Sequence, residues 1–106
     1  MASYKKAVEL DPQFIDAMMG LGEVYEEKGL YREAIGEYQR IVELDSKHAG
    51  ALYNLALVFE KVDPKEAVQH WERYIAIASK LSSEKDWVDI ARQHLKKLKG
   101  QLEKSQ

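Results

Sequence analysis

The sequence repeats itself with a period of 34 residues, and this repetition limits the possible folds more than any other feature. Four apolar or small residues recur in the same order at this spacing: Met18, Leu21, Gly22 and Tyr25, then Leu52, Leu55, Ala56 and Phe59. Residues 60–71 also resemble residues 27–38 at a spacing of 33, so one residue has been lost between Phe59 and Ala67. A period of this length is typical of chains built from stacked copies of one small supersecondary unit.

Apolar residues follow a helical spacing through almost the whole chain, and no segment has the pattern of a strand. The pattern predicts helices over 2–10, 13–28, 31–44, 47–61, 64–80 and 84–103. Asp11-Pro12 and Asp63-Pro64 are typical helix starts, because an Asp oxygen can accept from free amides and Pro tolerates the first helical position. Gly29 suits the left-handed residue that ends a helix. The links are so short that consecutive helices must be antiparallel neighbours.

The repeated residues match a known signature, W-x₂-L-G-x₂-Y followed by A-x₃-F and P. One copy is complete, with Met in place of Trp and Ser46 in place of Pro: Met18, Leu21, Gly22, Tyr25, Ala34 and Tyr38. The chain therefore resembles the tetratricopeptide repeat family. The resemblance implies an all-α fold, an α-solenoid (right-handed superhelix) of antiparallel helix pairs with about six helices and a C-terminal capping helix.

We expect a single domain over 1–106, divided in phase with the repeat. It would comprise a half repeat at 1–12, a complete repeat at 13–46, a shortened repeat at 47–81 and the capping helix at 82–106. Small residues such as Gly22 and Ala34 would allow helices to cross closely. The signature aromatic residues would fill the core: Tyr25, Tyr38, Phe59 and Trp71. In the capping helix the matching positions are Trp87, Ile90, Ala91 and His94.

No catalytic or metal-binding pattern is present. The chain has no cysteine, and no two of its three histidines are three or four residues apart. It also lacks a G-x-S-x-G elbow and a glycine-rich phosphate loop. His94 occupies a signature position, where a packing role is expected. We therefore expect no enzymatic activity, no metal and no cofactor.

Charge and hydropathy exclude two classes of partner. Basic residues gather near the C-terminus, but Lys96, Lys97 and Lys99 alternate with leucines, as on the solvated face of an amphipathic helix, so we expect no nucleic-acid partner. The N-terminal residues have no long apolar segment, and we expect neither a signal peptide nor a membrane partner. The absence of cysteine fits our expectation of a cytoplasmic protein and is also compatible with the periplasm.

The resemblance also implies where a partner would bind. In this family the first helix of each pair lines a concave groove that holds an extended peptide or a partner helix. The positions that match by phase are Asp16, Met19, Gly20, Glu23 and Glu26, then Gly50, Tyr53, Asn54, Leu57 and Lys61, and finally Val88, Asp89 and Arg92. This mixture of apolar and acidic residues favours a ligand with basic and apolar character. Of the clamp that some members use for a C-terminal carboxylate, only Asn54 is present, and Glu23 would repel such a ligand.

These features predict a non-catalytic protein–protein interaction scaffold. Two alternatives stay open: a self-associating assembly module, and a fragment of a larger regulatory protein. Self-association is expected through the half repeat, because the first helix of that repeat is missing and an apolar side is left uncovered. A weak homodimer would then have Tyr4, Val8 and Leu10 at its centre.

Overall fold

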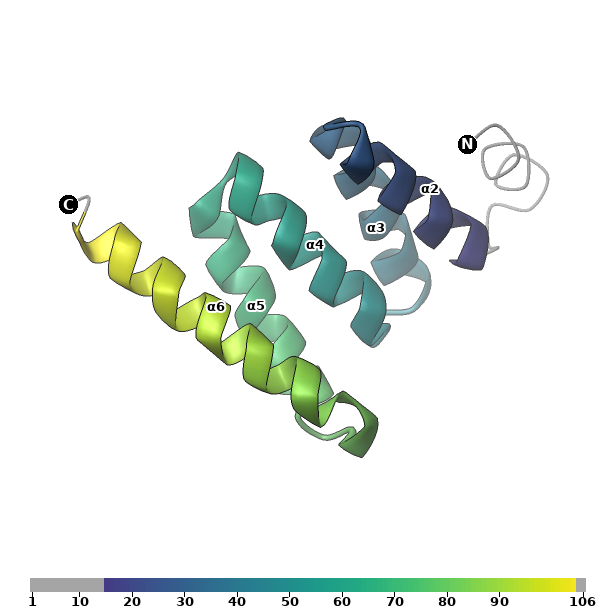
Figure 1. Ribbon diagram of the computed structural model, residues 1–106. Coiled ribbons are helices and arrows are strands. Elements are labelled where there is room, and N and C mark those ends of the chain that lie inside the picture. The colour runs from purple at the N-terminus through teal and green to yellow at the C-terminus, as the bar shows by residue number, and fades with distance from the viewer. Residues whose placement is uncertain (1–14, 105–106) are drawn as a thin grey trace.

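The computed structural model describes residues 15–104, and every regular element in this range is helical (Figure 1). The elements are α2 (Ile15–Glu27), α3 (Tyr31–Leu44), α4 (Ala49–Val62), α5 (Pro64–Ala78), a 3₁₀ turn η1 (Ser82–Glu84) and α6 (Lys85–Lys104). The five helices agree with the predicted ones to within a few residues. The predicted helix 2–10 and the expected self-association residues Tyr4, Val8 and Leu10 lie outside the described residues.

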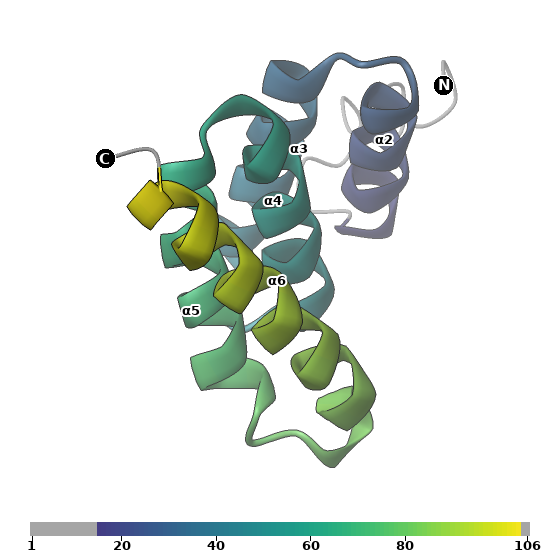
Figure 2. The ribbon, with the colours of Figure 1, turned by 60° about the vertical axis from the view of Figure 1, so that its left-hand side comes forward.

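The helices form the predicted α-solenoid. Each helix packs on the next along the chain, from α2 on α3 through to α5 on α6. In Figure 1, α2, α4 and α6 lie on the side nearest the viewer, with α3 and α5 behind them. The turned view in Figure 2 separates the same two layers. The first helices of successive pairs thus share one face of the molecule.

The links between helices are fixed by the residues at their ends. Asp63 alone separates α4 from α5, and its Oδ1 accepts a hydrogen bond from the Glu66 amide at 3.4 Å, with Pro64 at the first position of α5. Gly29 has φ +76°, the left-handed conformation that was predicted to end α2. The sequence did not indicate the cap of α4, where His48 Nδ1 accepts from the Ala51 amide at 3.0 Å.

The core is largely the one that the repeat predicts. Tyr38 and Trp71 are fully buried, as is Ala34. Tyr25 and Phe59 pack against this core, as predicted, but they are only partly buried. They lie toward the ends of α2 and α4, where fewer neighbouring side chains cover a helix.

The predicted orientation of α6 is only partly right: Ala91 is fully buried, as expected, but other positions are shifted by about one residue. Trp87 and Ile90, expected in the core, are 50% and 37% exposed, whereas Val88, expected in the groove, is only 3% exposed. The repeat spacing was extended across the link before α6, but this link contains the 3₁₀ turn η1. One residue corresponds to about 100° of rotation around a helix, so an error of this size exchanges buried and exposed positions.

Candidate peptide-binding groove

Three cavities open beside α4, all of them lined in part by α6, and one of them also reaches α2. We name each after one lining residue. The Leu57 cavity has a volume of about 590 Å³ and is lined by Glu26, Glu27, Tyr31, Leu57, Glu60, Lys61 and His94. The His94 cavity, of about 370 Å³, is lined by Glu60, Pro64, Gln93, His94, Lys97, Leu98 and Gln101. The Tyr53 cavity, of about 250 Å³, is lined by Gly50, Tyr53, Asn54, Tyr74, Glu84 and Trp87.

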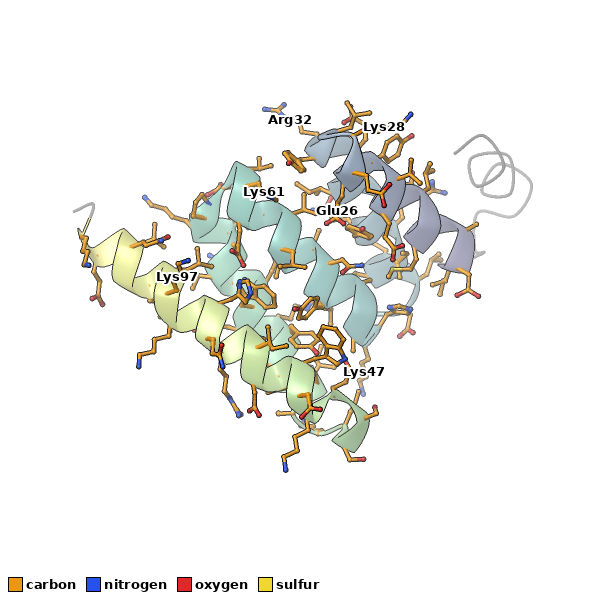
Figure 3. All side chains as sticks on the ribbon, in the orientation of Figure 1. Glu26, Lys28, Arg32, Lys47, Lys61 and Lys97 are labelled. Carbon is orange, nitrogen blue, oxygen red and sulfur yellow. The ribbon has the colours of Figure 1, made fainter. Side chains whose placement is uncertain are left out.

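The Leu57 cavity brings together three of the predicted groove residues, Glu26, Leu57 and Lys61. Figure 3 shows Glu26 and Lys61 on the same side of the molecule, one on α2 and the other on α4. The Lys61 ammonium lies 5.8 Å from the centre of the Tyr31 ring, within the range of a cation–π contact. This cavity therefore combines an apolar surface with charges of both signs.

The Tyr53 cavity contains three further predicted residues, Gly50, Tyr53 and Asn54, and half of its lining residues are aromatic. The Tyr53 ring meets three other rings edge to face, with centroids 5.1 Å from Trp71, 5.3 Å from Tyr74 and 5.3 Å from Trp87. Burial raises the pKa of Tyr53, and the charge of Glu60 raises it further. Trp87 was not predicted for the groove, because the phase assigned to α6 placed it in the core.

Seven predicted groove positions lie outside these cavities, and they include Gly20 on α2 and Val88 and Asp89 on α6. Asp16 and Glu23 are exposed on α2, and Met19 is partly buried, close to Gly50 of the next repeat. Arg92 is 60% exposed, forms an ion pair with Asp89 at 3.7 Å, and lines a separate cavity beside Val88. The structure thus does not bring Arg92 together with the residues of α4, because α6 is rotated relative to its predicted orientation.

Each repeat contains a similar, partly buried hydrogen bond from an aromatic residue to a glutamate. Tyr38 donates its hydroxyl to Glu26 Oε2 at 3.2 Å, and Trp71 donates its indole N–H to Glu60 Oε2 at 2.7 Å. The two glutamates are 34 residues apart, a recurrence that could have identified them in the sequence. Glu26, expected only as a steering charge in the groove, is therefore also a partner of the core.

The environment of these glutamates differs from that of a solvated carboxylate. Burial raises the pKa of Glu26, and the hydrogen bond from Tyr38 offsets part of this effect. The second glutamate has an additional neighbour, since His94 Nδ1 lies 2.8 Å from Glu60 Oε2 and the His94 ring stacks on Trp71 at 5.0 Å. His94 thus packs on the core, as expected, and also lines two of the cavities.

Residues 15–104 contain neither a candidate metal site nor a candidate membrane-spanning helix. In this part of the chain no three His, Asp or Glu residues are grouped so that they could hold a metal ion. None of its helices combines the length and the apolar character needed to cross a membrane.

Solved structures with the same arrangement of helices support the assignment of the fold. PcrH, crystallised in complex with the chaperone binding region of PopD, matches with a TM-score of 0.87 and 18% identity over 92% of this chain and 74% of that chain. The type III secretion translocator chaperone SycD of Yersinia enterocolitica matches with a TM-score of 0.88 and 20% identity over 94% and 70%. For the MamA protein the TM-score is 0.71 and the identity 27%, over 97% and 62%.

Among proteins with curated functions, none is similar enough in sequence to count as a match. The family assignment instead comes from the repeats, which match the tetratricopeptide repeat family over residues 2–49 and again over 27–81. The two matches together cover more than half of the chain, and they span the repeats that form α2 to α5. The chain belongs to the tetratricopeptide repeat family.

Proposed function

We propose that this protein is a non-catalytic interaction scaffold that holds an extended peptide or a partner helix along the face shared by α2, α4 and α6. One observation carries the proposal: Tyr53 and Leu57, four residues apart on one face of α4, line successive cavities. Binding sites are typically concave, with apolar walls and a few polar groups. The crystal structure of PcrH with a segment of PopD supports the idea that a solenoid of this shape can hold a peptide.

We further propose that the ligand combines apolar and basic side chains. Apolar contact would come from Tyr53, Leu57 and the exposed part of Trp87. The exposed carboxylates of α2, Asp16 and Glu23, would attract a basic segment and speed its association. Since such steering acts through solvent, binding should weaken as the salt concentration rises.

Peptide selection can test this proposal. A library of random peptides displayed on phage is selected on the immobilised protein, and the affinity of each enriched peptide is then measured in solution. We expect the double variant Tyr53→Ala, Leu57→Ala to bind at least about tenfold more weakly, because it removes the central contacts of the groove. Affinities are measured well below the melting temperature, since Tyr53 also packs on three core rings.

A matched double variant on the second helices serves as the control. Ile35 on α3 and Ile75 on α5 are partly buried against the same core and line none of the three cavities. The variant Ile35→Ala, Ile75→Ala should therefore lose stability but keep its affinity for the peptides. Equal affinity of both double variants, or no enrichment of any peptide on the wild-type protein, would show that the groove is not the binding site.

A further inference from the structure

The Tyr53 cavity has the walls of a site for a cationic side chain. The rings of Tyr53 and Trp87 meet at an interplanar angle of 76°, and the rings of Tyr53 and Tyr74 meet at 72°. Aromatic rings at steep angles thus line one small space, which Asn54 and Gly50 border on the α4 side. Trp87 is half exposed, and an incoming group can reach it without rearrangement of the core.

The cavity also contains one fixed carboxylate. Glu84 Oε1 accepts a hydrogen bond from the Tyr74 hydroxyl at 2.9 Å, which holds the acid in place. Burial raises the pKa of Tyr74, with the hydrogen bond and the charge of Glu84 acting in the same direction, so the hydroxyl stays protonated and continues to donate. No Lys or Arg lines the cavity, and within residues 15–104 none forms an ion pair with Glu84.

We propose that the Tyr53 cavity binds an arginine side chain of the peptide, with the guanidinium stacked on Trp87 and hydrogen bonded to Glu84. The inference rests on the proposed function, since it names the side chain that the groove selects. A guanidinium is planar, sheds its water more readily than an ammonium, and carries donors for a carboxylate at its edge. Cations bind over the faces of Trp and Tyr rings by attraction to the ring quadrupole.

Other occupants fit the cavity less well. An acidic side chain would be repelled by Glu84 at close range. An apolar side chain would fill the space but would partly desolvate the carboxylate of Glu84 without providing an opposite charge, which is unfavourable. A neutral polar side chain of the same shape would keep the stacking but would lose the attraction of opposite charges. The occupants therefore differ in affinity in a predictable order.

Capped amino acids test the site without involving the rest of the groove. N-acetyl-arginine methylamide is titrated into ¹⁵N-labelled protein, and the shifts of the indole N–H of Trp87 and of the amides around it are followed by NMR. The analogues with citrulline, a neutral isostere of arginine, and with norleucine are titrated in the same way. We expect arginine to bind with a dissociation constant at least about threefold lower than either analogue.

Variants identify the groups responsible. Glu84→Gln keeps the shape of the site but removes its charge, so the preference for arginine over citrulline should become smaller, and only the attraction of the guanidinium to the aromatic rings should remain. Asp86→Asn is the matched control, because Asp86 is an exposed acid two residues away that does not line the cavity, and it should leave the preference intact. Trp87→Leu keeps apolar bulk without a π face and should weaken arginine binding more than norleucine binding.

Three results would overturn the arginine site: equal affinity of citrulline and arginine for the wild-type protein, tighter binding of norleucine, or shifts confined to residues outside the cavity. Each of these can occur while selected peptides still bind the groove and lose affinity in the Tyr53→Ala, Leu57→Ala variant. In that case the scaffold function stands and only the assignment of this cavity is wrong.

Discussion

The ring of Tyr38 occupies the space that a side chain on Gly22 would need. A Cβ atom built on Gly22 would lie 2.5 Å from Tyr38 Cε1 and 2.8 Å from Cζ, closer than real Cβ atoms approach other heavy atoms. The ring cannot retreat easily, since Tyr38 is fully buried and its hydroxyl is bonded to Glu26. Gly22 is therefore what allows α2 and α3 to pack so closely.

Gly22→Ala should destabilise the protein, although alanine is intrinsically the better helix former by about 1 kcal/mol. The added methyl group must displace a buried aromatic ring, and overpacking of this kind typically costs about 1–3 kcal/mol. Gly36→Ala is the control, because Gly36 lies in α3 with nothing within 4 Å of its Cβ position and should gain stability. Urea denaturation of the two variants measures both effects. A gain of stability in both would contradict the close packing.

Glu26→Gln should remove a pH dependence from the stability. Burial raises the pKa of Glu26 above its ordinary 4.5, so the folded state holds this proton more tightly than the unfolded state. The contribution of Glu26 to the free energy of unfolding therefore decreases as the pH rises from the pKa of the unfolded state to that of the folded state. The variant should thus gain stability relative to the wild type as the pH rises from about 4 to 7, as urea denaturation at several pH values would reveal. A constant difference would mean that Glu26 is solvated.

His70 should produce the opposite dependence. It stacks on Phe59 at 4.6 Å, its Nδ1 is buried without a hydrogen-bond partner, and burial lowers its pKa below 6.5. The unfolded state then takes up the proton first, and stability is lost as the pH falls below 6.5 through the folded-state pKa. His70→Phe keeps the stacked pair without the titration. Between about pH 8 and pH 5, thermal melts should show a smaller loss for this variant than for the wild type, and parallel losses would contradict the assignment.

Glu60→Leu should cost more stability than Glu60→Gln. The leucine leaves the indole N–H of the fully buried Trp71 without an acceptor, and an unpaired buried donor costs about 1–3 kcal/mol. Glutamine keeps an oxygen for the same bond. Chemical denaturation compares the two variants, and the indole resonance of Trp71 should move far more in the leucine variant. Equal stabilities would indicate that water replaces the carboxylate.

The repeat makes part of this structure predictable. Gly22, Ala34 and Tyr38 have counterparts of similar size in Ala56, Ala67 and Trp71, because each helix pair must pack on the next in the same way. The positions of Tyr53 and Leu57 beside the cavities of α4 were predictable for the same reason, since both residues keep the spacing of 34 from α2. The repeat spacing thus predicts which face of a helix a residue occupies.

The orientation of α6 and the hydrogen bonds between helices could not be predicted, because they do not follow from the repeat spacing. The orientation of α6 depends on the 3₁₀ turn before it. For this reason the prediction buried Trp87 and exposed Val88, whereas the structure has the reverse. The bond between Glu60 and Trp71 joins residues 11 apart on different helices, and it requires particular rotamers as well as burial. The Tyr53 cavity could not be predicted either, because Trp87 lines it only in the observed orientation of α6.

Asp63 ends α4 and also caps α5, so neither helix can unravel at this point without loosening the other. The edge-to-face contact of Tyr53 with Trp71 and the bond from Trp71 to Glu60 join the same two helices. In a linear array each unit is stabilised by itself and by its neighbours, and opening spreads from the weaker units. The amide protons of α4 and α5 should therefore exchange with solvent together and last. This helix pair would then also be the nucleus on which the other helices assemble during folding.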